Sequence, residues 1–330
     1  MTKDSDQLPV LEVMGLRTVY RLRRGMVQAV DGVDLTVNRR ERVGVVGESG
    51  SGKSTLAFSI IRLILPPGEI VEGSVAVEGV DLLTLREEEL NRVRGTRIAM
   101  IYQDPLTYLN PVLRIGDQIA ESLITHQGMT RQEARAEVVH LLERLRLPSP
   151  RTLIDVYPHQ LSGGQRQRVV IGIAIACRPA LLIADEPTTA LDVTVQAEIL
   201  MLIDELVQEL GMSLLLISHD LGVIASVCDR VNVMYAGQII ETGPSAALYQ
   251  SPKHPYTAAL LGASTTLLEP RRRFATIPGA PPDLVRPVAG CRFADRCPAR
   301  MPICAEFPPA VQVGPEWQAS CWLHAKERVS

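Results

Sequence analysis

Apolar residues follow two patterns along this chain, and each pattern predicts a different kind of element. Four short apolar runs are typical of strands buried on both faces of a parallel sheet: Arg42–Val46, Ile98–Ile101, Ala180–Ala184 and Leu214–Asp220. Two longer segments, Glu12–Leu22 and Gly25–Val37, alternate β-branched and polar residues and are bounded by glycine. These two segments predict a further β portion at the start of the chain.

Three segments instead repeat apolar residues at steps of three and four, which predicts amphipathic helices: Arg114–His126, Thr130–Leu147 and Gln196–Leu210. Thr130 is a favourable N-cap for the second helix, and Gly211 is a favourable C-cap for the third. The first two predict a helix-rich section in the middle of the chain.

The pattern changes after about residue 250. The stretch "SPKHPYTAALLGA" predicts one short helix. Ten prolines then fall between Pro270 and Pro315, which excludes regular helices and central strands there. We expect a separate C-terminal extension over residues 261–330.

Length and composition narrow the class of protein. With 330 residues, about two domains are expected. A net charge of −3 gives no field that would attract nucleic acid, so no nucleic-acid partner is expected. The N-terminus lacks the pattern of a secretory signal, and the longest apolar run, Val169–Cys177, is too short to span a bilayer. We expect a soluble cytosolic chain whose thiols stay reduced.

The stretch "GVVGESGSGKSTL" carries the clearest chemistry. Residues 47–54 match the pattern G-x-x-x-x-G-K-[ST] between the strand Arg42–Val46 and a predicted helix over Ser54–Leu65, which is the context that a P-loop requires. Glycines at positions 47, 50 and 52 let successive N–H groups face one phosphate. Lys53 can reach the β- and γ-phosphates, and Ser54 can ligate Mg²⁺.

Further polar residues follow the other predicted strands. Asp185 and Glu186 end the run Ala180–Ala184, where one carboxylate can hold Mg²⁺ and the next can deprotonate water. His219 ends another strand, and Gln103 follows Ile98–Ile101. The segment "LSGGQ" (161–165) precedes a helical run and predicts a second helix N-terminus that can grip phosphate.

Together these motifs, in this order and near this spacing, resemble the ATP-binding-cassette (ABC) ATPases over about residues 8–260. The resemblance implies an α/β P-loop NTPase fold. It also implies an N-terminal antiparallel β portion, an inserted helical subdomain at about 104–165, and the C-terminal extension. The ligands it implies are ATP and Mg²⁺. The D-loop is "TALD" (189–192).

The resemblance also assigns roles to single residues. ATP would contact Tyr20 through adenine stacking, and the loop residues Gly47, Ser49, Gly50, Gly52, Lys53, Ser54 and Thr55 through phosphate. Mg²⁺ would be bound by Ser54, Gln103 and Asp185. Glu186 would be the general base, while Gln103 and His219 sense the γ-phosphate. Ser162 and Gly164 would contact the ATP of a partner cassette.

Four of the six cysteines, Cys291, Cys297, Cys304 and Cys321, lie in the proline-rich extension. Their spacing lacks both the short zinc knuckle and the usual ferredoxin pattern, so spacing alone does not name a metal. The segments "HPYTAALL", "IPGAPPDL" and "GCRFADRC" resemble the C-terminal extension of oligopeptide, dipeptide and nickel importer subunits. That resemblance implies a [4Fe–4S] cluster, with Zn²⁺ as the alternative.

The resemblance implies an ATPase subunit that powers peptide import from the cytoplasmic face of the membrane. The expected partners are a second ABC ATPase in a heterodimer, two transmembrane permease subunits and an extracytoplasmic binding protein. Nickel or glutathione import stays open, because these importers share the same motifs. A soluble ABC ATPase outside transport is a further alternative, but the chain has one cassette and no sustained heptads, which disfavours it. A redox-regulatory module is another alternative, and the intact Glu186 disfavours it.

Overall fold

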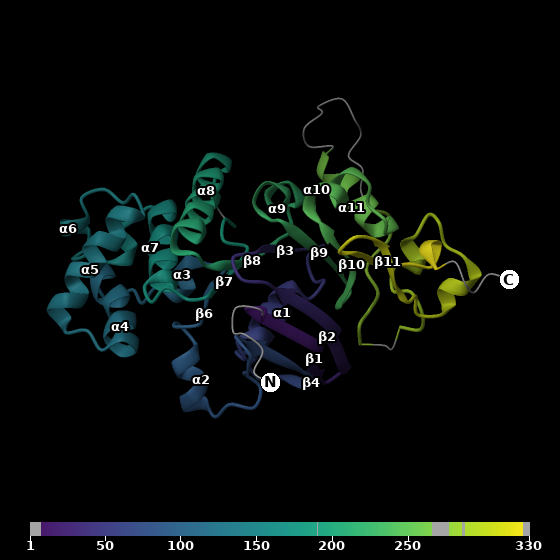
Figure 1. The fold of residues 1–330 in the computed structure, drawn as a ribbon, viewed down its shortest axis with the longest axis horizontal. Helices are drawn as coiled ribbons and strands as arrows, with labels where there is room; N and C mark the ends of the chain where they lie inside the picture. The colour runs from purple at the N-terminus through teal and green to yellow at the C-terminus, as the bar shows by residue number, and fades with distance from the viewer. Residues whose placement is uncertain (1–7, 190, 266–276, 286–287, 326–330) are drawn as a thin grey trace. The chain divides into compact units, whose positions relative to one another are not determined.

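Two interleaved sets of residues form separate compact units in the computed structural model (Figure 1). The structure describes residues 8–325 except 190, 266–276 and 286–287. The first unit takes its described residues from 1–10, 37–40 and 77–215, and the second takes them from 11–36, 41–76 and 216–330. The predicted limits of the cassette, helical subdomain and extension stay predictions.

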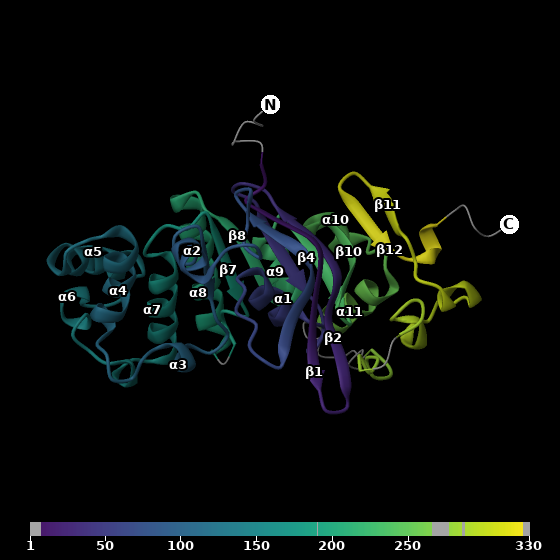
Figure 2. The same cartoon turned by 90° about the horizontal axis from the view of Figure 1, so that it is seen from below.

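A mixed sheet forms the centre of the second unit. β3 (Arg42–Val46) pairs in parallel with β9 (Arg230–Tyr235), with Val43 opposite Arg230 and Val46 opposite Val233. β3 is buried, as its apolar run predicts. The sheet continues antiparallel through β10 (Gln238–Pro244), β12 (Trp317–Ser320) and β11 (Ala310–Gly314). The C-terminal extension therefore contributes two strands to this sheet (Figure 2).

The predicted N-terminal β portion is confirmed. β1 (Leu11–Leu22) lies between β2 (Gly25–Val37) and β4 (Gly68–Val77) in a second sheet (Figure 2). Two residues join β1 to β2, so these strands run antiparallel. α1 (Lys53–Ile60) packs on β1, where the buried Thr18 and Ser59 hydroxyls share a 2.7 Å hydrogen bond. The helix that follows the glycine loop is thereby fixed to this sheet.

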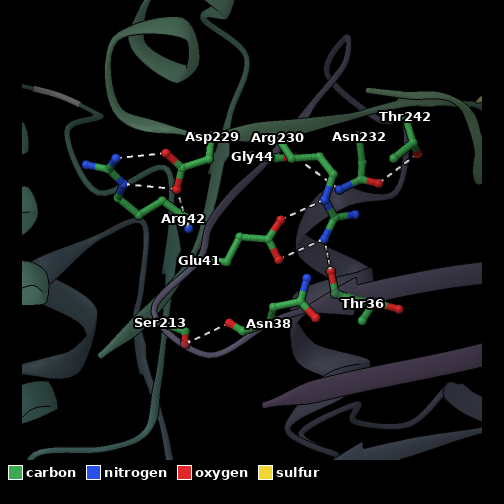
Figure 3. A network of polar contacts seen from close by, with 10 residues as sticks. All are labelled: Thr36, Asn38, Glu41, Arg42, Gly44, Ser213, Asp229, Arg230, Asn232 and Thr242. Carbon is green, nitrogen blue, oxygen red and sulfur yellow. Dashed lines mark hydrogen bonds and ion pairs between the residues drawn. The ribbon is translucent and has the colours of Figure 1, made fainter. Parts of the chain in front are cut away.

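Charged pairs flank the start of β3 (Figure 3). Arg42 binds Asp229 through both its Nε and Nη2, at 3.2 and 2.8 Å from the carboxylate. Arg230 binds both oxygens of Glu41, at 2.7 and 3.0 Å, and donates to the carbonyl of Thr36. These contacts join β3 to the start of β9. The unit also contains the α-helices α9 (Leu221–Val227), α10 (Ser245–Gln250) and α11 (Pro255–Thr265), and three short 3-10 helices in the extension, Ala294–Arg296, Pro302–Ala305 and Trp322–His324.

In the first unit, β6 (Ile98–Ile101) pairs in parallel with β7 (Leu181–Asp185), with Ile101 opposite Ala184. Both strands are buried over their whole length. α7 (Gly163–Ile175) packs on β6 and against α8 (Val193–Leu210). Other elements are β5 (Val80–Asp81) and α2 (Glu87–Val93), and β8 (Ser213–Ser218), which follows α8, has only its first three residues in this unit. Two parallel strands thus end side by side.

The predicted helix-rich section is also confirmed. It contains α3 (Pro105–Tyr108), α4 (Ile115–Gln127), α5 (Arg131–Arg144) and α6 (Pro150–Leu153), and Figure 1 shows α4 to α7 as one group. Thr130 caps α5 by accepting from the Glu133 N–H, and the Glu133 carboxylate accepts from the Thr130 N–H. α8 ends at the predicted Gly211, whose φ is 66°.

Several predicted boundaries are wrong. α5 ends at Arg144 and not at Leu147, α8 begins at Val193 and not at Gln196, and β8 ends at Ser218 and not at Asp220. The largest difference is at the end of α1. The helix after the glycine loop ends at Ile60 and not at Leu65. Arg62 takes a φ of 55°, while Arg62 N–H donates to Ser59 and Leu63 N–H donates to Phe58. This pair of contacts is a Schellman termination with arginine in the position usually held by glycine. Within the residues that the structure describes, none of the helices has the length and apolar character needed to cross a membrane.

Candidate functional site

The loop between β3 and α1 is shaped by glycine. A Cβ on Gly47 would lie 2.1 Å from the Met234 carbonyl oxygen, and a Cβ on Gly52 would lie 2.2 Å from the Ala29 carbonyl oxygen. Gly50 and Gly52 also have φ values of 78° and 106°. The loop therefore curls tightly against two backbone strands, which only glycine allows.

Lys53 opens the helix that follows. Its side chain is buried, and Nζ donates to the carbonyl oxygens of Gly47 and Glu48 at 2.9 and 3.0 Å. Gly52 is the N-cap and gives the helix no side-chain hydrogen bond, and Ser54 and Thr55 lie in the first turn. A helix N-terminus with a lysine amino group at its loop is suited to a phosphate. The loop thus fits the predicted nucleotide.

Two more predicted residues lie in the second unit. Tyr20 is half-buried on β1, with its ring so close to Gly68 that a Cβ there would lie 2.9 Å from it. His219 is exposed directly after β8. The next residue, Asp220, caps α9 by accepting from the Gly222 N–H at 2.7 Å. The roles of Tyr20 and His219 stay predictions.

The first unit brings Gln103 and Glu186 together at the ends of β6 and β7. Gln103 Nε2 donates to Glu186 Oε2 at 3.1 Å, and Thr189 Oγ1 donates to the same oxygen at 3.0 Å. Glu186 has a φ of 45°, a conformation that non-glycine residues adopt uncommonly. The glutamate carboxylate is therefore oriented by two donors and by its backbone.

Asp185 ends β7 and is only 2% exposed. Nearby, Tyr108 stacks on Tyr102 with ring centroids 3.7 Å apart. Burial raises the pKa of the Tyr108 hydroxyl, and the negative charge of Asp185 raises it further. The predicted magnesium ligand is thus a buried carboxylate whose charge acts on the Tyr108 hydroxyl.

The LSGGQ segment forms the N-terminus of α7. Ser162 is the N-cap; its hydroxyl accepts from the Gln165 N–H at 3.3 Å, and the Gln165 side chain accepts from the Ser162 N–H at 3.0 Å. A Cβ on Gly164 would lie 2.9 Å from Val195 in the first turn of α8. The N-termini of α7 and α8 therefore pack against each other, and Ser162 is exposed at the surface.

The four cysteines of the extension are free thiols. Cys291 N–H donates to the Cys304 carbonyl at 2.9 Å, so the first and third lie together. Burial raises the pKa of Cys321 to about 11, and the neighbouring thiols also raise it. The four thiols match the predicted [4Fe–4S] cluster in the number and kind of ligands. However, in the part of the chain that the structure describes, three or more metal-binding side chains nowhere assemble into a metal site.

Sequence reasoning missed three residues at these sites. Thr189 donates a hydrogen bond to Glu186, three positions earlier in the chain. The sequence does mark this residue, because Thr189 begins the TALD segment of the D-loop. Arg296 binds the carboxylate of Glu48, and the Tyr256 hydroxyl accepts from the Glu48 N–H. Arg296 and Tyr256 lie more than 200 positions from the loop, and nothing in the local pattern points to the contact.

A glycine loop between a parallel strand and a helix, with two carboxylates at a strand end, one of them buried, and a capped LSGGQ turn, defines a P-loop ATPase of the ABC class. Residues 30–189 match the family model described as ABC transporter, and residues 240–304 match the model described as Oligopeptide/dipeptide transporter, C-terminal region. The chain belongs to the ABC transporter family and is an ATPase of that family. ATP and Mg²⁺ are the ligands expected for such an enzyme.

Similar proteins match over almost their whole length. The oligopeptide transport ATP-binding protein OppD of Salmonella typhimurium is 46% identical, covering 96% of this chain and 95% of the relative. A putative peptide import ATP-binding protein of Brucella abortus is 49% identical, covering 95% of this chain and 94% of the relative.

Solved structures share the fold. The ATP-binding cassette MJ0796, solved as a dimer bound to ADP and Pi, has a TM-score of 0.64 at 28% identity, covering 71% of this chain and 98% of that one. CbiO1 from Clostridium perfringens has a TM-score of 0.62 at 26% identity, covering 80% and 96%. The predicted fold class is thereby confirmed.

Proposed function

We propose that this chain is the ATP-hydrolysing subunit that energises import of peptides across the cytoplasmic membrane. The observation that carries the proposal is the likeness, over at least 95% of this chain, to proteins named for oligopeptide transport and peptide import. The match of residues 240–304 to an oligopeptide/dipeptide transporter region supports the same cargo class.

In the proposed reaction the glycine loop binds the phosphates of ATP. Lys53 and the first-turn N–H groups of α1 neutralise phosphate charge, with Ser49, Ser54 and Thr55 as further contacts. Ser54, Gln103 and Asp185 would hold Mg²⁺, which supplies additional positive charge to the phosphates. Tyr20 would stack on adenine.

Hydrolysis in this proposal depends on Glu186. Its carboxylate accepts from Gln103 and Thr189, and this orientation suits a base that removes a proton from the attacking water. Gln103 and His219 would position the γ-phosphate. The water oxygen forms the new bond to phosphorus while the bond to ADP breaks, so the products are ADP and phosphate.

A partner cassette completes each site in this proposal. Ser162 and Gly164 at the N-terminus of α7 would contact the ATP of a second ABC ATPase subunit, in a heterodimer. The dimer solved for MJ0796 supports the pairing of two cassettes. Two transmembrane permease subunits and an extracytoplasmic binding protein would complete the importer, with this chain peripheral at the cytoplasmic face.

The function is tested by co-purifying the chain with its permease partners and binding protein in lipid vesicles. We expect peptides to be taken up and to stimulate ATP hydrolysis, and Lys53→Ala to abolish both. Stimulation by nickel or glutathione, with none by peptides, would reassign the cargo. ATP hydrolysis without any stable permease complex would instead support a role outside transport.

We further propose that Cys291, Cys297, Cys304 and Cys321 bind a [4Fe–4S] cluster, with Zn²⁺ as the alternative. Four soft thiolates within a short, proline-rich segment support a metal centre that helps this segment fold. Anaerobically purified protein should be brown and contain iron, and Cys297→Ser should lose both features. One zinc per chain would support the alternative, and metal-free protein with an intact extension would refute both.

A further inference from the structure

The C-terminal extension touches the phosphate-binding loop through one arginine. Arg296 Nη1 lies 2.7 Å from Glu48 Oε2, and Nη2 lies 2.9 Å from Oε1, so the guanidinium binds both carboxylate oxygens. The arginine side chain is 5% exposed, against 26% for the glutamate. A two-point pair of this kind fixes orientation as well as charge.

Arg296 is itself held firmly. Its Nε donates to the Pro278 carbonyl at 3.0 Å, and its Nη2 donates to the Ile277 carbonyl at 3.3 Å. The guanidinium also lies 5.8 Å from the ring centroid of Tyr235 and 5.9 Å from that of Phe293. These contacts come from the extension and from β9, so the guanidinium cannot follow Glu48 if the glutamate moves.

Glu48 connects this arginine to the loop. Its N–H donates to the Tyr256 hydroxyl at 2.8 Å, and its carbonyl oxygen accepts from Lys53 Nζ at 3.0 Å and from the Ser51 N–H at 3.1 Å. Glu48 is the second residue of the glycine loop, so its negative charge lies close to where phosphate binds. Without a neutralising partner that charge would repel phosphate.

We propose that Arg296 is a positioning residue for ATP: it holds and neutralises Glu48, so that the extension sets the ATP affinity of its own loop. This proposal rests on the nucleotide-binding role of the loop. The arginine touches neither ATP nor the reacting atoms. Because Cys297 follows directly in the chain, the fold of the cysteine segment determines where the guanidinium lies.

The test is steady-state ATP hydrolysis by the full chain paired with its partner ATPase, with direct binding of a fluorescent ATP analogue. Arg296→Ala should raise both KM for ATP and the dissociation constant about tenfold, the effect of losing one charged contact, with kcat within about twofold. Arg296→Lys should fall between this variant and wild type, because it restores charge without the two-point geometry. Arg300→Ala is the control, since Arg300 pairs with Asp295 on the exposed surface of the same segment.

A second substitution separates positioning from a merely structural role. Glu48→Gln in the Arg296→Ala background removes the unneutralised charge and should recover most of the lost ATP affinity. Emission from Trp317 and Trp322, both in the extension, reports whether this segment stays folded. Unchanged KM in Arg296→Ala, or no recovery on adding Glu48→Gln, would overturn the inference. Wild-type protein that binds no ATP would overturn the nucleotide role of the loop instead.

Discussion

Gly52 of the phosphate-binding loop is required by its backbone conformation and by lack of space. Gly52 combines a φ of 106° with a neighbouring carbonyl oxygen 2.2 Å from the position of a Cβ. Gly128, at the end of α4, has a φ of 68° but nothing within 4 Å of that position. Comparing substitutions at Gly52 and Gly128 therefore separates the cost of backbone strain, which both glycines avoid, from the cost of a steric clash, which only Gly52 avoids.

We expect Gly52→Ala to destabilise the protein by about 3 kcal/mol or more and to abolish ATP binding, because the loop must move off Ala29. Gly128→Ala should cost only about 1–2 kcal/mol and leave ATP binding unchanged. Urea unfolding and nucleotide binding measure the two effects. Equal losses of stability in both variants would show that relieving the clash at Gly52 costs no measurable free energy.

Glu186 carries the proposed proton transfer. Glu186→Gln keeps the shape of the side chain but removes the base, so hydrolysis should fall about 100-fold or more while Mg-ATP still binds. Glu209→Gln is the control, since Glu209 lies on the exposed face of α8 in a pair with Arg144. Hydrolysis within about tenfold of wild type would remove Glu186 from the role of base.

At the scale of elements, two helices begin with the same kind of cap. Ser162 on α7 and Thr130 on α5 each form a reciprocal pair with the third helical residue, Gln165 and Glu133 respectively. In the proposed function only Ser162 also contacts a partner's ATP.

Ser162→Ala and Thr130→Ala should therefore each lower stability by about 1 kcal/mol, because each loses the hydroxyl that caps its helix. Only Ser162→Ala should also lower ATP hydrolysis. Thermal unfolding and steady-state ATPase rates of both variants check this pair of expectations. A similar fall in hydrolysis for Thr130→Ala would mean that helix stability, and not phosphate contact, accounts for the loss.

The sequence predicted most elements because their signals are local. Buried strands, the Thr130 cap and the Gly211 terminus all depend on residues within a few positions of one another. The end of α1 was missed because Arg62 adopts a positive φ that glycine usually provides. Glu186 and Gln103 were predicted from strand ends, but the hydrogen bonds that Gln103 and Thr189 both donate to the Glu186 carboxylate depend on side-chain geometry that no pattern records.

At the scale of the whole molecule, the proposed sites require two chains. A Lys53→Ala chain and a Ser162→Arg chain should each be inactive alone, because each damages every site of a like pair. Mixed together they retain one site with an intact loop and an intact LSGGQ segment. Recovered ATPase activity in the mixture checks this; if the native partner is a different subunit, that subunit carries one of the changes.

Failure to recover activity in mixtures shown to dimerise would count against sites shared between chains.

Contacts between residues far apart in the sequence limit what the sequence can predict. The contact of Arg296 with Glu48 spans 248 positions, and only the folded chain brings the two together.

The pairing of β12 with β10 has a consequence for solubility. β12 places Ala319 opposite Glu241, and Trp317 Nε1 donates to that buried carboxylate at 2.9 Å. A chain cut after residue 265 would leave β10 with unpaired backbone groups, which recruit strands of other molecules. We expect the shortened chain to aggregate, as light scattering would measure, and Thr242→Lys to reduce this. The extension would then act as a guard against self-assembly, whatever its metal content.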